Sequence, residues 1–227
     1  MSKQILMIVT SHGRIDAERK TGLWYEELAE PYSVFQEQGY DITVASPQGG
    51  AVPIDPNSNP DDPDEAIMKV IENTYPLSEI DTDGYDALFI PGGHGAMFDL
   101  ATAEVGAAVE AFIHEGRVVG SVCHGPAGLV EARNSAGLPT IDGYRLTSFT
   151  NAEEEAAGLV DEMPFLLQSK LEELGARFET ADNYTDHVVV DRNLVTGQNP
   201  QSSASAAHAM VDVLQKASAN AEGAHTS

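Results

Sequence analysis

Cysteine is almost absent from this chain, because Cys123 is the only one among 227 residues. A single cysteine excludes an intrachain disulfide and leaves one thiol that is free to act as a nucleophile. The opening run Met1–Thr10 is short and lacks a small-residue cleavage site, so it predicts a first core strand rather than a signal peptide. We therefore expect a cytoplasmic protein.

Positive charge is also scarce, with 12 Lys and Arg residues against 36 Asp and Glu residues, for a net charge of -24. Nucleic-acid binding needs a basic surface, and anionic membranes attract basic segments. We therefore expect neither a nucleic acid nor a membrane as partner. The surplus of acid fits two explanations, a strongly solvated surface or adaptation to high salt that screens self-repulsion. The sequence leaves both open.

Long apolar runs and metal-ligand spacings are missing as well. No stretch approaches the roughly 18 apolar residues of a membrane span, although 42% of the residues are hydrophobic, which is enough for a full core. The seven histidines show no tight spacing of the HExxH kind. We therefore expect no metal.

Strand-like and helix-like segments alternate along the chain, which predicts an α/β fold with a mostly parallel sheet and helices on both faces. We expect one domain over residues 1–218 and a frayed tail over 219–227, because the tail is small and polar. The expected strands are Ile5–Thr10, Ile42–Ala45, Asp86–Ile90, Arg117–Val122, Arg145–Phe149, His187–Val190 and Leu194–Thr196. The expected helices are Gly22–Gln38, Ala103–Glu115, Pro126–Ala132, Pro164–Leu174 and Ser202–Lys216.

Cys123 lies between an expected buried strand and an expected helix, with small residues on both sides. This is the arrangement of a nucleophile elbow, in which a sharp turn exposes the reactive side chain at the carboxyl end of a sheet. The positive end of the following helix would favour the thiolate. The pattern predicts that Cys123 is a nucleophile.

Two backbone segments near this turn are candidates for stabilising an oxyanion. The N–H of His124 has the position at which an elbow supplies an oxyanion donor, although a helix-capping role also fits this histidine. The glycines of Pro91–Gly95 follow a strand and allow the backbone to approach a ligand closely. A phosphate-binding loop is the rival interpretation, but no Lys-Ser/Thr or GxGxxG pattern accompanies them.

Carboxylates provide the remaining candidates. On a helical wheel Glu26 lies opposite the apolar stripe and faces water, whereas Glu27 lies on the flank of the stripe. An unpaired carboxyl there would have a raised pKa and could share a proton with a thiolate. An edge position with the carboxyl reaching water is the alternative. The segment Thr150–Glu155 predicts the start of a helix, with Thr150 or Asn151 as cap.

These segments together resemble the DJ-1/PfpI superfamily, and within it the Hsp31-like glyoxalase III branch. The matching pieces span nearly the whole chain in order and are Thr21–Glu27, Ala45–Gly50, Pro91–Gly95, Val122–Pro126, Phe149–Glu155 and Leu194–Pro200. The Cys-His-Gly-Pro and Thr-Gly-Gln-Asn-Pro pieces are specific in combination.

The resemblance implies a flavodoxin-like three-layer sandwich and a Cys-His-Glu triad. Cys123 and His124 match its first two members, and Glu154 matches the third, with Glu153 or Glu155 in its place if the register is off by one. It also implies Glu27 as the acid beside the thiolate, and the N–H groups of Gly93 and His124 as the oxyanion pocket. The extra domain and His/Glu metal cluster of the larger bacterial Hsp31 chaperones have no match here, so no metal site is carried over.

The activity that the resemblance implies is that of a cofactor-free glyoxalase III (D-lactate dehydratase), which converts methylglyoxal to lactate without glutathione. Its substrate would be a small 2-oxoaldehyde, attacked by the Cys123 thiolate. The alternatives are an Hsp31-like holdase chaperone of the stress response and a protein deglycase that uses the same cysteine. A homodimer is the usual assembly of the superfamily and the commonest default.

Overall fold

The computed structural model describes residues 2–224 and contains a seven-stranded sheet in the order β3-β2-β1-β4-β5-β9-β8. All neighbouring strands pair in parallel except β8 and β9, which are antiparallel. This arrangement confirms the predicted α/β fold. The strands are β1 (Gln4–Ile8), β2 (Asp41–Ser46), β3 (Tyr75–Pro76), β4 (Ala87–Ile90), β5 (Val118–Val122), β8 (Val188–Asp191) and β9 (Leu194–Gly197).

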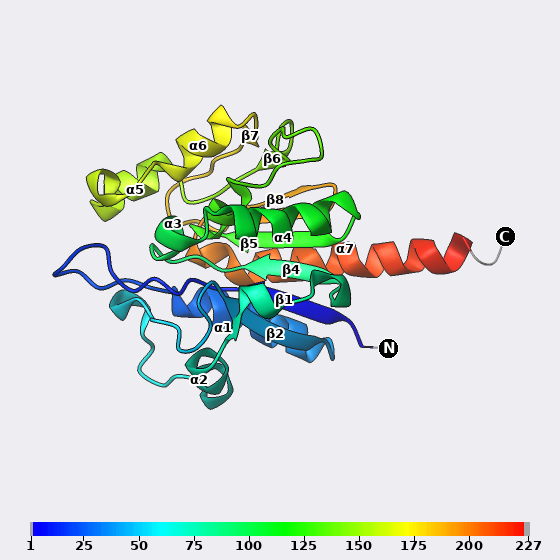
Figure 1. The fold of residues 1–227 in the computed structure, drawn as a ribbon, viewed down its shortest axis with the longest axis horizontal. Helices are drawn as coiled ribbons and strands as arrows, with labels where there is room; N and C mark the ends of the chain where they lie inside the picture. The colour runs from blue at the N-terminus through cyan, green and yellow to red at the C-terminus, as the bar shows by residue number, and fades with distance from the viewer. Residues whose placement is uncertain (1, 225–227) are drawn as a thin grey trace.

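Helices cover both faces of this sheet (Figure 1). Helices α1 and α7 pack against each other on one face, and α3 and α4 lie on the other. A separate two-stranded ladder joins β6 (Arg145–Leu146) to β7 (Arg177–Phe178). The helices are α1 (Tyr25–Glu37), α2 (Glu65–Glu72), α3 (Ala96–Asp99), α4 (Ala103–His114), α5 (Asn151–Ala157), α6 (Leu167–Glu173) and α7 (Ser203–Ala224).

The strands divide the hydrophobic core into two layers by simple alternation. In β4, Phe89 packs into the layer shared with α1 and α7, whereas Leu88 and Ile90 pack into the layer shared with α3 and α4. Successive side chains of a strand point to opposite faces, so a strand that is buried on both faces is apolar throughout. This is why the strands of the central sheet are short continuous hydrophobic runs.

The structure corrects three expected elements. The expected helix Pro126–Ala132 is a short 3-10 helix, Gly125–Leu129, because two glycines and a proline disfavour a regular α-helix. The expected strand Arg145–Phe149 contributes only the two paired residues of β6. Helix α7 continues to Ala224, past the expected end at Lys216, since alanines with high helix propensity extend it beyond the body.

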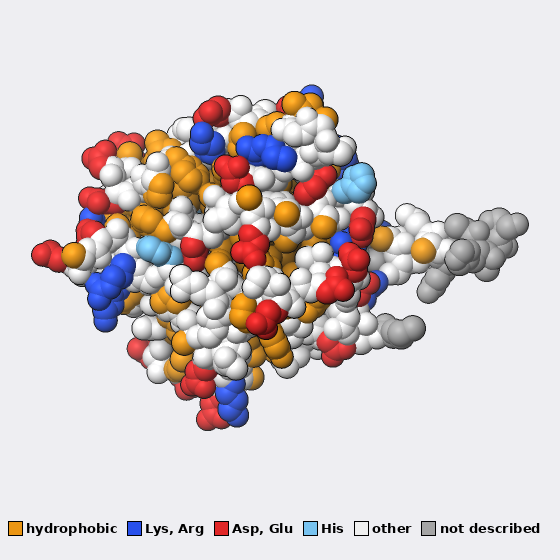
Figure 2. Space-filling view, in the orientation of Figure 1, with side chains coloured by type: hydrophobic (Ala, Val, Ile, Leu, Met, Phe, Trp, Pro, Cys, Tyr) orange, Lys and Arg blue, Asp and Glu red, His pale blue; other side chains and the backbone are white. Residues whose placement is uncertain are grey.

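The loops that follow β1, β4 and β5 meet at the carboxyl edge of the sheet, at the left of Figure 1. Sites in parallel α/β sheets form at this edge, because loops from neighbouring strands lie side by side there. Across residues 2–224, no helix is both long and apolar enough to cross a membrane. Figure 2 shows acidic side chains scattered over the visible face rather than gathered in one cluster.

Candidate active site

Cys123 directly follows β5 and has a left-handed backbone conformation, with φ of 58°. Its N–H donates to the carbonyl of Gly197 at 3.0 Å, and its carbonyl accepts from the N–H of Phe149 at 2.9 Å. A non-glycine residue at positive φ is strained, and such strain persists only where the surroundings hold it in place. The turn therefore has the geometry expected of a nucleophile elbow.

The thiol of Cys123 is buried, with only 3% of the residue exposed. Burial raises the pKa of Cys123 well above its usual value, and the charges of nearby carboxylates act in the same direction. The N–H of His124 is the group that opposes them. The expected preference for the thiolate is therefore wrong for the resting site. The 3-10 helix after Cys123 spans five residues, too few for a strong dipole, and desolvation prevails.

Glu27 is completely buried near the thiol. Its Oε1 accepts from the N–H of Gly92 at 2.9 Å, whereas its Oε2 has no hydrogen-bond partner among the described residues. Burial raises the pKa of Glu27 well above its usual value, although the N–H of Gly92 and a contact with the Cys123 thiol lower it. The direction of this shift is the one that the position on the helical wheel predicts for an unpaired carboxyl.

Glycine at position 92 allows three segments to meet at this point. A Cβ on Gly92 would lie 2.6 Å from the backbone nitrogen of His124 and 2.9 Å from Oε1 of Glu27. Any side chain would push the elbow, α1 and the loop after β4 apart. Glycine is thus required by close approach of the backbone, as the sequence suggests for this loop.

His124 connects Cys123 to α5. Its Nδ1 lies 3.4 Å from Sγ of Cys123, and its Nε2 lies 2.6 Å from Oε2 of Glu154. Burial and the charge of His94 lower the pKa of His124, although Glu154 opposes both. His124 is therefore a neutral base with one nitrogen directed at the thiol. Of the three glutamates left open by the register, only Glu154 contacts it.

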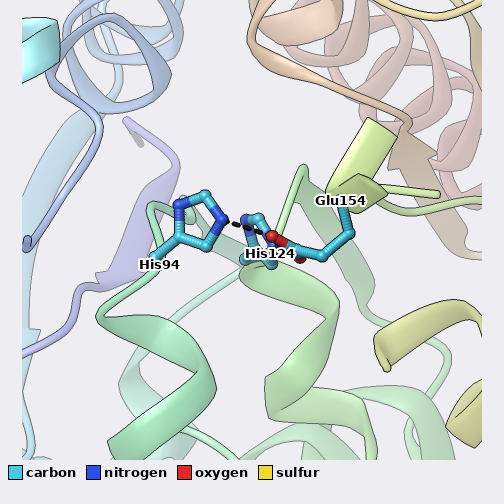
Figure 3. A group of neighbouring side chains, drawn as sticks. All are labelled: His94, His124 and Glu154. Atoms are coloured by element: carbon cyan, nitrogen blue, oxygen red, sulfur yellow. Dashed lines mark hydrogen bonds and ion pairs between the residues drawn. The ribbon is translucent and has the colours of Figure 1, made fainter. Parts of the chain in front are cut away.

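His94 is the site residue that sequence reasoning did not assign. Its Nε2 lies 2.6 Å from Oε1 of Glu154, and its ring centroid lies 4.2 Å from that of His124 (Figure 3). Burial tends to raise the pKa of Glu154. The two histidines act in the opposite direction through their charges and their hydrogen bonds, and the pKa is lowered to about 2. The signal available in the sequence was the position of His94 in a glycine-rich loop directly after an expected strand.

His94, His124 and Glu154 could also hold a metal ion, since their ligand atoms lie within 4.8 Å of one another. The histidine spacings in the sequence do not reveal this group, because its members come from three separate segments. Both carboxylate oxygens of Glu154 already accept a hydrogen bond from an imidazole. Hydrogen bonding thus accounts for the cluster without an ion.

The neighbouring glutamates have different environments. Glu153 is fully buried and completes a capping box with Thr150, and its Oε2 accepts from the N–H of Tyr184 at 2.9 Å and from the side chain of Asn199 at 3.0 Å. These hydrogen bonds connect α5 to the segment before β8, which contains Tyr184, and to the segment after β9, which contains Asn199. Glu155 is exposed to solvent. Of these three glutamates, only Glu154 hydrogen-bonds to the two histidines.

A cavity of about 510 Å³ opens beside Cys123. Gly93, His94 and His124 contribute to its wall, so both predicted sources of oxyanion N–H groups border it. Its other lining residues are mostly apolar or cationic: Ile15, Arg19, Lys20, Trp24, Phe149, Ala157, Leu159, Tyr184 and Pro200, together with Asp55, Asn57 and Gln201. A cavity of this size accepts a small organic molecule.

The chain is similar to known proteins over most of its length. The chain is 30% identical to glyoxalase 3 of Candida albicans over 233 residues, which cover 93% of this chain and 98% of that one. It is 32% identical to the glutathione-independent glyoxalase hsp3102 of Schizosaccharomyces pombe over 218 residues, covering 86% and 90%. The crystal structure of glyoxalase III from Candida albicans superimposes with a TM-score of 0.86 at 28% identity, covering 93% and 97%.

A family model supports the same assignment over most of the length. The model of the DJ-1/PfpI family matches residues 21–213, a range that includes every candidate site residue described above. With this match, the two relatives and the shared fold, the chain belongs to the DJ-1/PfpI family.

Proposed function

We propose that this protein is a glutathione-independent glyoxalase of the glyoxalase III type (a D-lactate dehydratase), which converts methylglyoxal to lactate without a cofactor. The names of its relatives support this activity. The observation that carries the proposal is the Cys123–His124–Glu154 chain, with separations of 3.4 and 2.6 Å, at the wall of a cavity. Acyl chemistry on a thiol requires a nucleophile, a base and a residue that orients the base.

The reaction begins with proton transfer from Cys123 to His124. The Glu154 carboxylate accepts the Nε2–H of His124 and so leaves Nδ1 as the acceptor that faces the thiol. Because burial raises the pKa of Cys123, the thiolate forms when His124 takes this proton as the substrate binds. The charge of Glu27 raises the pKa of Cys123, so protonation of the Glu27 carboxyl favours formation of the thiolate.

The thiolate then attacks the aldehyde carbon of methylglyoxal. The sulfur–carbon bond forms, the aldehyde oxygen takes a proton from His124, and the product is a hemithioacetal. Moving the hydrogen of that carbon to the neighbouring ketone carbon converts the hemithioacetal into the thioester of lactate. Water cleaves the thioester, which releases lactate and restores the thiol. We assign stabilisation of the oxyanions to the N–H groups of Gly93 and His124, since both residues line the cavity.

A lactate assay on methylglyoxal without glutathione tests the proposal. We expect the wild type to form lactate and Cys123→Ala to lose at least about 100-fold in rate, because no other described thiol can form the covalent intermediate. His114→Gln, at an exposed residue at the end of α4, is a control that should keep the wild-type rate. Lactate formation by Cys123→Ala at the wild-type rate would rule the mechanism out.

The holdase alternative has less support from the surface. A holdase needs a large exposed apolar patch. The large hydrophobic side chains most exposed in the described part of the chain are dispersed over separate segments: Tyr75, Leu138, Tyr184 and Val190. An aggregation assay on Cys123→Ala separates the two functions, because holding does not need the thiol.

Deglycation would require the same cavity to admit a protein side chain. A cytoplasmic homodimer remains the expected form.

A further inference from the structure

One carboxylate in this site holds two imidazoles at once. Oε1 of Glu154 is 2.6 Å from Nε2 of His94, and Oε2 is 2.6 Å from Nε2 of His124. Figure 3 shows the two rings reaching the carboxylate from different segments of the chain. A triad needs only one histidine, so the second hydrogen bond requires an explanation of its own.

The charge of Glu154 determines where the protons of both rings lie. Its pKa is held to about 2, so it is a carboxylate that can only accept hydrogen bonds. Each Nε2 must therefore carry a hydrogen, and in the neutral rings each Nδ1 is left as a free acceptor. For His124 this acceptor faces Sγ of Cys123.

The free nitrogen of His94 has no such partner. In Figure 3 its Nδ1 lies on the side of the ring away from Glu154. Among the described residues no group hydrogen-bonds to it, and His94 lines the cavity beside Cys123. An imidazole that a carboxylate orients and that lines a substrate cavity has the properties of an acid–base residue.

We propose that His94 is a second acid–base residue, which carries the substrate hydrogen from the aldehyde carbon to the ketone carbon. This inference rests on the glyoxalase function proposed above. It divides the chemistry between two histidines that share one carboxylate. His124 exchanges a proton with the thiol, and His94 moves a proton between the two substrate carbons.

The step balances without any further reactant. Nδ1 of His94 takes the hydrogen of the hemithioacetal carbon as a proton, and the released electron pair forms a double bond to the ketone carbon. The ketone oxygen becomes an enediolate oxygen and receives the hydroxyl proton of the hemithioacetal. The protonated His94 then returns its proton to the former ketone carbon, while the former aldehyde carbon regains its carbonyl as a thioester.

The alternative carriers are less well placed. Glu27 is completely buried, one of its oxygens already accepts from Gly92, and it is not among the described residues that line the cavity. His124 is engaged with the proton of Cys123, and its ring lies 4.2 Å from that of His94. Two imidazolium charges at that distance repel each other, so the two rings carry their extra protons one after the other rather than together.

Steady-state kinetics and thiol alkylation on His94→Gln test the role. The glutamine amide can still donate to Glu154 but cannot carry a proton. We expect lactate formation to fall about 100-fold, within the range for loss of general acid–base catalysis. The rate at which iodoacetamide alkylates Cys123 should stay close to that of the wild type, because His124 keeps its partners. His114→Gln is the matched histidine control.

Chemical rescue separates a proton carrier from a structural residue. In His94→Ala, added imidazole should restore lactate formation, and the rescued rate should follow the neutral form of imidazole as pH changes. A purely structural role predicts no such rescue. The inference is overturned if His94→Gln retains the wild-type rate, or if imidazole restores nothing while Cys123 alkylation is normal. Failure of the wild type to make lactate would instead remove the proposed function on which the inference rests.

Discussion

Glu27 is a carboxyl buried without a cationic partner among the described residues, and this has a cost in stability. Burial raises its pKa well above the ordinary value of 4.5. Because the pKa of this group is lower in the unfolded chain, its ionisation favours the unfolded state as pH rises above 4.5. Residues that are retained for function commonly destabilise a fold in this way.

We expect Glu27→Gln to unfold at a higher urea concentration than the wild type at neutral pH. A group with a raised folded pKa contributes its full stability below the unfolded pKa, and that contribution falls as pH rises, by at most about 1.4 kcal/mol per pH unit for one proton. The amide has no proton to lose, so the advantage of the variant should shrink as pH falls toward 4.5.

The neighbouring half-buried Glu26 provides the control for this measurement. Its side chain accepts from the indole of Trp24 at 3.2 Å and is not fully buried. Glu26→Gln makes the same carboxyl-to-amide change on the neighbouring residue and so controls for the substitution itself. An advantage of Glu27→Gln that stays constant from acidic to alkaline pH would contradict the raised pKa.

At the scale of the element, the short helix α5 positions Glu154. The side chain of Thr150 accepts from the N–H of Glu153, and the side chain of Glu153 accepts from the N–H of Thr150. With Thr150 as the N-cap, the helix begins at Asn151, so that Glu154 reaches the histidines from the first turn. The helix ends after two turns at Gly158, which has φ of 71°.

Removing the cap should therefore affect the site as well as stability. We expect Thr150→Ala to lower the free energy of unfolding by about 1 kcal/mol, the usual cost of a lost N-cap. It should also lower the rate of lactate formation, because Glu154 loses its fixed position. Thr102→Ala removes the cap of α4, at a residue outside the described cavity lining, and should cost similar stability with no change in that rate. Equal rates in the two variants would show that the cap of α5 does not serve the site.

How far the sequence predicts the site depends on how local each contact is. The turn at Cys123 and the burial of Glu27 follow from local patterns, a strand end and a helical stripe. The contact of Glu154 with His124 depends on helix register, which the sequence leaves open within one residue. The place of His94 depends on the pairing of β4 with β5 and on the path of a glycine loop. Spacing in the sequence does not record such contacts.

At the scale of the whole molecule, the chain has a net charge of -24, and acidic side chains are scattered over the face that Figure 2 shows. Few of the acidic groups are neutralised, since the chain has only 12 Lys and Arg residues. Mutual repulsion among such charges opposes the compact state. Added salt weakens this repulsion, because the screening length falls from about 10 Å at 0.1 M to about 3 Å at 1 M.

We therefore expect the thermal midpoint to rise by several degrees between about 0.1 and 1 M sodium chloride. Potassium chloride should act equally, because screening depends on ionic strength rather than on the cation. Scanning calorimetry or circular dichroism measures the midpoint. A midpoint that stays constant or falls over this range would show that surface repulsion is not a significant cost and would leave high solvation as the explanation of the charge.

The hydrogen bonds of Cys123 to Gly197 and Phe149 have a last consequence for the reaction. They hold the backbone of the attacking residue on both sides, so the sulfur can move only by rotation about χ1. The larger changes of position during the reaction must then be made by the substrate. Natural variants could therefore acquire new aldehydes by remodelling the loops around the cavity while the sulfur stays where it is.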